Sequence, residues 1–409
     1  MLVHWIWLST RPGMHDRARA ALLEKLQDID KIYRGKAEDY AQVASLRPED
    51  VTALLDKDLT EAEEILRTAA AKKLKILTWG DEAYPKRLKN IPDPPVVLYY
   101  KGKLPDFDSE AAIGVVGTRK ASAYGLKIAE RIGGEIARCG GLVVSGLASG
   151  IDAAAMQGAV SEKVPTVGVL GCGADRIYPS SNRAVYAGVL EDGCILSEFP
   201  PGTKPFRWNF PKRNRIISGL SCGVLVVEAS EVSGALITAR QAADQGRDVF
   251  VVPGNVDTAS CAGSNALLRD GAIAISNGWE LLSEYEALYP DKIRKVPRKQ
   301  KKETPKLSML LDLLREENEA QPEEKQPISG KTAQKDIDNP PSGAYIDPES
   351  LTPEQRCIVT QLAGGPKLLD AVIAESALPT AKALSALTLL EIQGIAERLP
   401  GKKIGLKQH

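Results

Sequence analysis

Residues 199–221 combine cations and aromatic side chains in a pattern that suits a nucleic-acid strand. The segment reads FPPGTKPFRWNFPKRNRIISGLS, and no acidic residue lies between Glu198 and Glu228. Its cations are Lys204, Arg207, Lys212, Arg213 and Arg215. Interleaved with them are Phe206, Trp208 and Phe210. Cations can follow a phosphate backbone, and aromatic faces can stack on bases at roughly 1–3 kcal/mol per base. The alternative, a solvated basic loop, would leave an exposed apolar patch.

The same segment favours a single strand over a duplex. Bases of a single strand are free to stack on protein side chains. Reading the major groove of a duplex would instead need a basic helix. We expect Pro201, Pro205 and Pro211 to exclude a helix over residues 201–211. The segment therefore predicts a site for single-stranded nucleic acid.

Three further loops have the composition of ligand-binding loops. They are GTRKASAYG at Gly117–Gly125, SGLASGID at Ser145–Asp152 and GCGADRIYPSSN at Gly171–Asn182. Glycine lets a backbone approach a ligand closely, and Arg119 and Lys120 in the first loop suit a phosphate. Structural roles stay open for the other two loops. Ser145 could cap a helix, Asp152 could favour its own helix dipole, and the glycines at 171 and 173 could simply turn the chain.

The usual nucleotide and metal signatures are missing. The sequence has no GxxxxGK[ST] loop, and GCGADR lacks the third glycine of a dinucleotide fingerprint. The histidines are His4, His15 and His409, and no two cysteines form a CxxC pair. We therefore expect no cofactor, no metal site and no histidine-based catalytic triad.

Composition bounds the class of protein. The chain has 409 residues, with 53 basic and 53 acidic side chains, so its net charge is zero. Nucleic acid or a membrane would have to bind a local patch, because the protein has no strong global field. The six cysteines lie mostly in apolar or glycine-rich runs, as in proteins of a reducing compartment. We read the apolar start MLVHWIWLST as buried core and expect a cytoplasmic protein without membrane contact.

Changes in composition along the sequence divide it into four regions. Residues 1–72 predict an N-terminal helical (SAM-like) domain, with helices at Ala18–Gln27 and Glu61–Ala71 and a helix start at Pro48. Residues 73–290 alternate short apolar runs with helical stretches, which predicts βαβ units and a Rossmann-like parallel sheet. Residues 291–349 are charged and proline-rich and predict a disordered linker. Residues 350–409 predict three helices and a hairpin at 395–406, a winged-helix-like domain. The fold class is thus α/β, a Rossmann-like core flanked by two smaller domains.

Several long motifs resemble the DNA-processing protein A family (DprA, also called Smf). They are VVGTRKASAYG, VVSGLASGIDAAA, SEFPPGTKPFRWNFPKRNRIISGLS, VLVVEASEVSGALITARQAADQGRDVFVVPG and GSNALLRDGA. The entry segment ILTWGDEAYPKRLKNIPDPPVVLYYKG also matches. The resemblance covers residues 76–278. The N-terminal helices and the C-terminal module match the family by their position in the chain and their general composition. Where the family often has an LPGVG-like hairpin, this chain has only STRPGM.

The resemblance implies a binding protein rather than an enzyme. Members of the family bind single-stranded DNA, form homodimers and load the RecA recombinase during natural transformation. The DNA contacts implied here are Arg119, Lys120, Ser145, Gly146, Lys204, Arg207, Phe210, Lys212, Arg213, Asn214 and Arg215, with Phe210 stacking on a base. Residues 263–274 are implied as the dimer face, including Asn265, Leu268 and Ala274. The helix predicted at Ala235–Gln245 is a weaker candidate for the RecA contact.

Two other classes of function remain to be weighed. The first is a nucleoside-monophosphate hydrolase of the lysine-decarboxylase-like fold, with Glu198 or Glu228 as the catalytic carboxylate. Its PGGxGT loop is absent here, and pairing of Glu228 with Arg213 or Arg215 is the favoured interpretation of that carboxylate. The second is a DNA-binding regulator that uses residues 350–409. The predicted recognition helix of that module, TAKALSALTLLEIQG, is largely apolar, which favours packing or protein contacts over groove reading.

Overall fold

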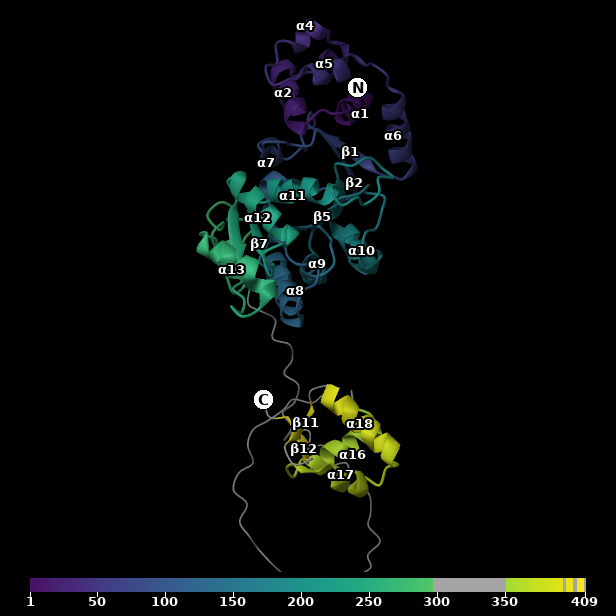
Figure 1. The fold of residues 1–409 in the computed structure, drawn as a ribbon, viewed down its shortest axis with the longest axis vertical. Coiled ribbons are helices and arrows are strands. Elements are labelled where there is room, and N and C mark those ends of the chain that lie inside the picture. Colours follow the sequence, from purple (N-terminus) through teal and green to yellow (C-terminus); the bar gives the residue numbers. More distant parts are fainter. Residues whose placement is uncertain (297–350, 393–394, 400–402, 408–409) are drawn as a thin grey trace, which may run out of the picture. The chain divides into compact units, whose positions relative to one another are not determined.

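A computed structural model describes residues 1–296, 351–392, 395–399 and 403–407 (Figure 1). The chain divides into two compact units, Met1–Arg298 and Lys299–His409. Most of the predicted linker, residues 297–349, lies outside the described residues. The first six residues of that predicted linker are described and belong to the sheet unit, because Ile293 is buried in its core. The boundary predicted at residue 290 therefore falls too early.

In the described part of the first unit, nine strands form one mostly parallel sheet, which confirms the predicted α/β core. The strand order is β1-β2-β6-β5-β4-β3-β7-β8-β9. The antiparallel edge consists of β1 (Lys75–Thr78) and β2 (Val97–Gly102), which pairs with β6. The parallel strands are β3 (Ala111–Val116), β4 (Gly141–Ser145), β5 (Thr166–Val169), β6 (Cys194–Ser197), β7 (Gly223–Val226), β8 (Asp248–Val251) and β9 (Ile273–Ala274).

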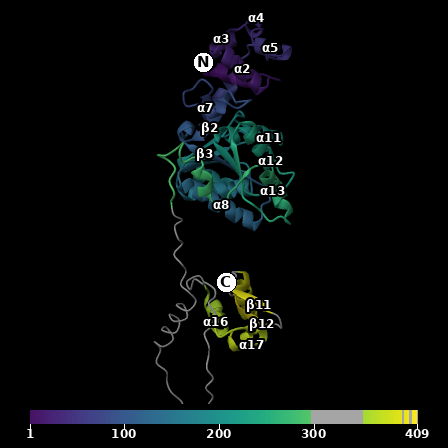
Figure 2. The ribbon, with the colours of Figure 1, turned by 90° about the vertical axis from the view of Figure 1, so that its left-hand side faces the viewer.

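Helices cover both faces of the sheet (Figures 1 and 2). One face packs on α8 (Ala123–Arg138), α9 (Ile151–Ser161), α10 (Arg183–Asp192) and α14 (Gly278–Ser283). The other packs on α7 (Lys86–Lys89), α11 (Asn209–Leu220), α12 (Gly234–Asp244) and α13 (Ala262–Arg269). In β3, Ile113 joins the first core and Ala112 and Val116 join the second. Burial on both faces explains why the strands read as continuous apolar runs.

The basic–aromatic segment is helical in its second half, contrary to expectation. Pro201 and Pro205 lie outside any helix, but α11 begins at Asn209 and contains Pro211 as its third residue. The first four N–H groups of a helix have no partner within the helix, so a proline there removes no hydrogen bond. The predicted exclusion of a helix up to residue 211 is therefore wrong for its last three residues.

The N-terminal helices are α1 (Leu2–Thr10), α2 (Asp16–Leu26), α3 (Ile29–Arg34), α4 (Ala37–Tyr40), α5 (Pro48–Leu55) and α6 (Thr60–Ala71). Pro48 occupies the first helical position of α5, as predicted. The apolar start of the chain is buried at Ile6, Trp7 and Leu8. The core of these helices continues onto Val97 and Tyr99 of β2. The domain boundary at residue 72 stays a prediction, since one core spans it.

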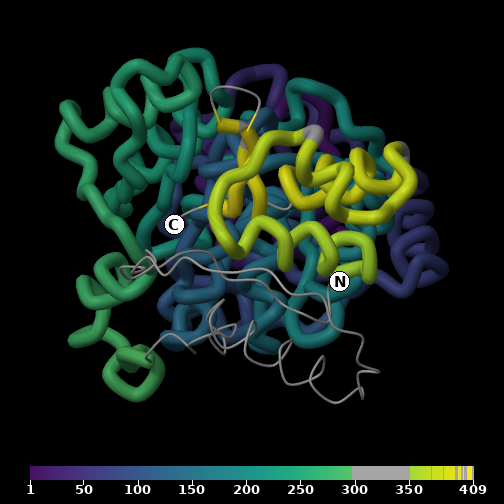
Figure 3. The backbone as a smooth tube through the Cα atoms, turned by 90° about the horizontal axis from the view of Figure 1, so that it is seen from below, coloured from purple at the N-terminus to yellow at the C-terminus, as the bar shows by residue number. Residues whose placement is uncertain are grey.

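The second unit contains α16 (Pro353–Leu362), α17 (Leu369–Glu375) and α18 (Thr380–Ile392), with strands β10 (Lys367–Leu368), β11 (Ala396–Leu399) and β12 (Lys403–Leu406). The strands pair in the order β10-β12-β11. Figure 3 shows these helices grouped with the hairpin β11–β12. The predicted hairpin at 395–406 is thus confirmed. Throughout the described ranges, no helix is long and apolar enough to cross a membrane.

Candidate nucleic-acid interface

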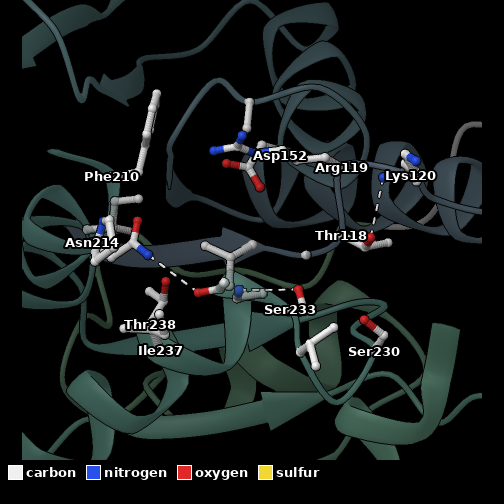
Figure 4. A pocket seen from close by; sticks show the side chains of 18 of the residues that line it. Thr118, Arg119, Lys120, Asp152, Phe210, Asn214, Ser230, Ser233, Ile237 and Thr238 are labelled. Carbon is white, nitrogen blue, oxygen red and sulfur yellow. Dashed lines mark hydrogen bonds between the residues drawn. The ribbon is translucent and has the colours of Figure 1, made fainter. Parts of the chain in front are cut away.

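A pocket of about 860 Å³ opens at the carboxyl ends of β3 and β7 (Figure 4). Most of its wall comes from three segments: residues 116–120 after β3, residues 205–217 around the start of α11, and residues 230–238 at the start of α12. The rest comes from Ala148, Asp152, Tyr178, Ala259 and Ser260. This is the edge at which parallel α/β sheets bind their ligands. The predicted DNA contacts that line it are Arg119, Lys120, Arg207, Phe210, Arg213 and Asn214. Ser145, Gly146, Lys204, Lys212 and Arg215 do not line it.

Phe210 carries a cation on one face of its ring. The guanidinium carbon of Arg119 lies 4.9 Å from the ring centroid. Tyr178 packs nearby, with its centroid 5.7 Å from that of Phe210 and an interplanar angle of 37°. A Cβ on Gly171 would come within 2.9 Å of the Phe210 ring. Gly171 therefore does more than turn the chain, because its missing side chain makes room for this ring.

Arg213 forms the floor of the pocket. Its side chain is buried and donates from Nη1 to the backbone oxygen of Gly146 at 2.8 Å and to that of Val169. Burial lowers the pKa of Arg213, and the charge of Asp152 opposes this shift. A Cβ on Gly146 would lie 2.4 Å from the guanidinium nitrogens. Gly146 is thus needed to seat a cation, and it also lines an adjoining cavity of about 50 Å³ beside Phe210.

The donors predicted at the end of β4 are already engaged. The Ser145 hydroxyl donates to the backbone oxygen of Val115 at 2.7 Å, and the residue is fully buried. The Gly146 N–H donates to Asp152 Oδ2 at 3.1 Å. Burial raises the pKa of Asp152, although Arg213 and three backbone N–H groups oppose the shift. Neither predicted donor points freely into the pocket, so these two residues shape the site from below.

Arg215 does not belong to the pocket, and its predicted DNA contact is not supported by its position. Only 2% of its side chain is exposed. Its guanidinium pairs with Glu198 at 2.6 Å, Asp16 at 2.9 Å and Asp93 at 3.1 Å. The physical reason is helical geometry: Arg213 and Arg215 lie two residues apart on α11 and face different sides.

Lys212 and Lys204 lie outside the pocket, both in exposed positions. The Lys212 ammonium lies 3.0 Å from Asp16 and 3.3 Å from Glu198, so carboxylates already balance its charge. No ion pair of Lys204 is found among the described residues. Lys204 therefore remains a candidate for contact with a strand that leaves the pocket.

The wall formed by α12 was missed by the sequence reasoning. Ser230, Ser233 and Thr238 line it, and Asn214 donates across to the backbone oxygen of Gly234 at 3.4 Å (Figure 4). The Ser233 hydroxyl accepts from the Ala235 N–H at 3.3 Å and so caps the helix. The signal was present in EASEVSGAL, where a serine precedes a helix directly after a buried strand.

Among the described residues Glu228 pairs with no arginine, contrary to the favoured interpretation. Its carboxylate accepts from the Ser122 N–H at 3.2 Å and from the Ser122 hydroxyl at 2.8 Å. A Cβ on Gly125 would lie 2.0 Å from this carboxylate. Glu228 therefore anchors the first turn of α8, where the positive end of the helix dipole favours a negative charge. Sequence reasoning could not foresee this, because the partner lies 106 residues away.

The residues implied as a dimer face lie at the free edge of the sheet. Ala274 is in β9, the edge strand, and Ile273 beside it is exposed. Leu268 on α13 packs partly against the core, while the Asn265 amide bonds both backbone groups of Gly254, at 3.1 and 3.2 Å. A groove of about 430 Å³ runs between α12, α13 and this edge. Their role as an interface stays a prediction.

No group of three or more metal-binding side chains occurs in the part of the chain that the structure describes. The six cysteines are free thiols, and Cys139, Cys172 and Cys194 are buried. Burial raises the pKa of Cys172 to about 11, so its thiol stays protonated. The pocket presents cations, hydroxyls, an amide, aromatic rings and the carboxylate of Asp152.

Comparison with known proteins agrees with this architecture. The family model described as DNA recombination-mediator protein A matches residues 75–286, and that of the DprA winged helix domain matches residues 343–402. Protein Smf of Synechocystis sp. is 36% identical over 349 residues, 83% of this chain and 82% of that protein. The DNA processing protein DprA of Bacillus subtilis is 44% identical over 205 residues, 50% of this chain and 69% of that protein.

A solved structure has the same fold. The X-ray structure of DNA processing protein A from Streptococcus pneumoniae superposes with a TM-score of 0.61 at 33% sequence identity. The match covers 69% of this chain and 98% of that chain. The family model spans the whole parallel sheet and its pocket loops, from β1 to beyond α14. The chain therefore belongs to the DNA recombination-mediator protein A family.

Proposed function

We propose that this protein binds single-stranded DNA in the pocket at the carboxyl edge of its sheet and delivers it to a RecA-type recombinase. The observation that carries the proposal is the arrangement of Arg119 over Phe210, 4.9 Å from the ring centroid. A cation of the kind that binds phosphates and a ring of the kind that stacks on bases are thus in direct contact, which supports the proposal. Arg207 and Lys120 line the same pocket and add further charge.

Binding requires Arg119 and Phe210 to separate. In the present arrangement the guanidinium covers one face of the ring. An incoming base would take that face, and the guanidinium would turn to the neighbouring phosphate. Arg119 is exposed at the start of a loop, so this movement breaks no core packing. Asn214 and the hydroxyls of Ser230 and Thr238 offer hydrogen bonds on the opposite wall.

A hydrolytic role is less well supported than binding, because the candidate carboxylates are committed to structure. Glu228 holds Ser122, Glu198 pairs with Arg215, and Asp152 receives the Gly146 N–H. Of the three, Asp152 lines the pocket, and backbone N–H groups together with the charge of Arg213 hold its carboxylate. We therefore infer that the pocket holds a strand without cleaving it.

Family membership and the exposed edge of the sheet support the proposed partners. We propose a cytoplasmic homodimer that uses β9 and the groove beside α13, since an unpaired strand edge with an exposed Ile273 favours association. Recombinase loading and a place in natural transformation are proposed by relation to the family. The C-terminal module is proposed as a protein-contact unit, because Lys367 pairs with Glu375 and Lys382 with Glu354.

The deciding experiment is a titration with single- and double-stranded oligonucleotides of the same sequence, with an AMP hydrolysis assay alongside. We expect tight binding of the single strand, weaker binding of the duplex and no release of adenine. Adenine release that disappears in a Glu228→Gln variant would establish the hydrolase instead. Equal affinity for both DNA forms would contradict the proposed selectivity.

A further inference from the structure

Two aromatic rings are stacked on the surface beside the pocket. The rings of Phe206 and Trp208 lie 4.8 Å apart between centroids and only 7° from parallel. Trp208 is 71% exposed, which makes it the most exposed aromatic side chain among the described residues, and Phe206 is 43% exposed. Aromatic rings of this size are usually buried, because each carries a large apolar surface. An exposed stack therefore calls for a functional explanation.

The stack is held in a fixed place. Asn209, directly after Trp208, is buried and donates from its side chain to the backbone oxygens of Gly171 at 3.0 Å and Lys204 at 3.3 Å. The Phe206 N–H donates to Lys204 at 2.9 Å, and the Asn209 N–H donates to Phe206 at 3.1 Å. These bonds fix a tight turn over residues 204–209. The rings project from a rigid support, so presenting them costs little further ordering.

The surroundings of the stack favour a polyanion with flat, apolar groups. Arg207 lies between the two rings in sequence and lines the pocket, as does Pro205. Lys204 is exposed at the start of the turn. Arg176 donates from Nε to the backbone oxygen of Gly202 at 3.0 Å, which fixes another cation beside the same turn. A single strand that leaves the pocket past Arg207 would meet the outer face of Trp208 directly.

We propose that the Phe206–Trp208 stack is a second base-binding platform, outside the pocket, on which a nucleotide of the same single strand extends the stack by one ring. This inference rests on the proposed binding of single-stranded DNA. It assigns to Trp208 a role distinct from that of Phe210: Phe210 binds a base within the pocket, and Trp208 guides the strand where it leaves. Because every base has an aromatic face, the platform would accept any sequence.

The test uses the full chain and an oligothymidylate of about 20 nucleotides, long enough to cross both sites. Trp208→Ala should weaken binding by at least about fivefold, which corresponds to about 1 kcal/mol. Its salt dependence should match that of the natural protein, because stacking releases no counterions. Trp208→Phe should bind nearly as well as the natural protein, since it keeps an aromatic face. The melting temperatures of both variants should be unchanged.

Leu288→Ala is the matched control. Leu288 is 72% exposed, close to the value for Trp208. It lies near Tyr285 and Tyr289, which contact Asp248 and Cys222 at the amino ends of β8 and β7, the edge opposite the pocket. This variant should bind the oligothymidylate as the natural protein does. If the removal of any exposed apolar side chain lowers the affinity for DNA, the affinity of this control variant will fall as well.

Tryptophan emission gives a direct readout. The spectrum of the natural protein minus that of Trp208→Phe reports on Trp208, and it should be quenched when the oligothymidylate binds. An abasic strand of equal length keeps the phosphates but has no bases, so it should leave this difference unchanged. The proposed base-binding role would be overturned if Trp208 is not quenched, or if Trp208→Ala binds as tightly as the natural protein. A contact with a protein partner would then be the better explanation of the exposed stack. If the natural protein binds no single-stranded DNA, the proposed function fails together with this inference.

Discussion

The guanidinium of Arg215 lies 2.6 Å from the carboxylate of Glu198, and both side chains are buried beneath the basic segment. Asp16, from helix α2 of the N-terminal region, approaches the same guanidinium to 2.9 Å. One arginine therefore joins α11, the end of β6 and the N-terminal helices. In the sequence, the arginines of the basic segment look like equivalent DNA contacts. In the structure, Arg213 lies beneath the pocket, whereas Arg215 joins parts of the fold.

The first prediction is that Arg215→Ala destabilises the protein by about 3–5 kcal/mol, because it leaves buried carboxylates without a partner. Arg119→Ala should change the free energy of unfolding by no more than about 0.5 kcal/mol, since that side chain is exposed. Urea denaturation followed by circular dichroism measures both. If Arg215→Ala has normal stability but does not bind DNA, this prediction is wrong and Arg215 contacts the DNA strand.

The second prediction concerns how the stability of the protein changes at low pH. Burial opposes ionisation of Asp16, but the charges of Arg215, Lys212 and Arg19 outweigh it and lower the pKa of Asp16 to about 2. A carboxylate whose pKa is lower in the folded state stabilises the fold above its ordinary pKa, near 4, and this contribution is lost as the pH falls toward 2. The contribution at neutral pH should be on the order of 2 kcal/mol.

Asp16→Asn tests that contribution. The variant should be less stable than the natural protein at neutral pH, and the difference should shrink steadily between about pH 4 and pH 2. Burial raises the pKa values of Glu198 and Asp93, and the charge of Asp16 adds to both shifts, so Asp16→Asn also lowers these two pKa values and thereby offsets part of the stability lost at neutral pH. A difference in stability that stays constant over this range would show that the charge of Asp16 does not act in the folded state.

The third prediction separates charge from stacking. If Arg119, Lys120 and Arg207 each meet a phosphate, the logarithm of the binding constant should fall with the logarithm of salt concentration at a slope near −2, about −0.7 per contact. Arg119→Ala should weaken binding and flatten the slope by somewhat less than one unit. Lys163→Gln removes a charge after the end of α9, at the opposite edge of the sheet, and should leave the slope as it is.

The fourth prediction concerns Phe210, whose ring is partly buried between Arg119 and Tyr178. Phe210→Ala should reduce the free energy of binding to single-stranded DNA by about 1–3 kcal/mol and leave the salt slope almost unchanged. Phe210→Tyr keeps the aromatic face and should retain most of the affinity. Melting temperature must be measured with affinity, because a steep drop in Phe210→Ala would mean that the ring mainly supports the loop.

The fold could be predicted from the sequence because local sequence patterns agree with the observed helices and strands. Apolar runs marked the strands on both sides of β3, and Pro48 marked the start of α5. Arg119 and Phe210 were predicted as binding residues because each lies in a short segment of suggestive composition, and the structure brings both to one pocket. The partners of Arg215 could not be read, since Asp16 lies 199 residues away and only the folded chain brings the two together. Pro211 misled because a proline is tolerated in the first turn of a helix.

The last prediction concerns the edge strand. Ala274 lies in β9 and is exposed, with nothing paired beyond it in the described sheet. If two copies join along this edge and the groove beside α13, Ala274→Arg should place two charges in the interface and yield a monomer by light scattering. The monomer should bind a short oligonucleotide normally but a long strand more weakly, because two linked pockets on one strand act through effective concentration. Asp244→Arg, at the end of α12, is the control that adds a positive charge outside the groove lining. A folded Ala274→Arg protein that stays dimeric would place the interface elsewhere, and an unchanged affinity for long strands in a true monomer would show that the two pockets act independently.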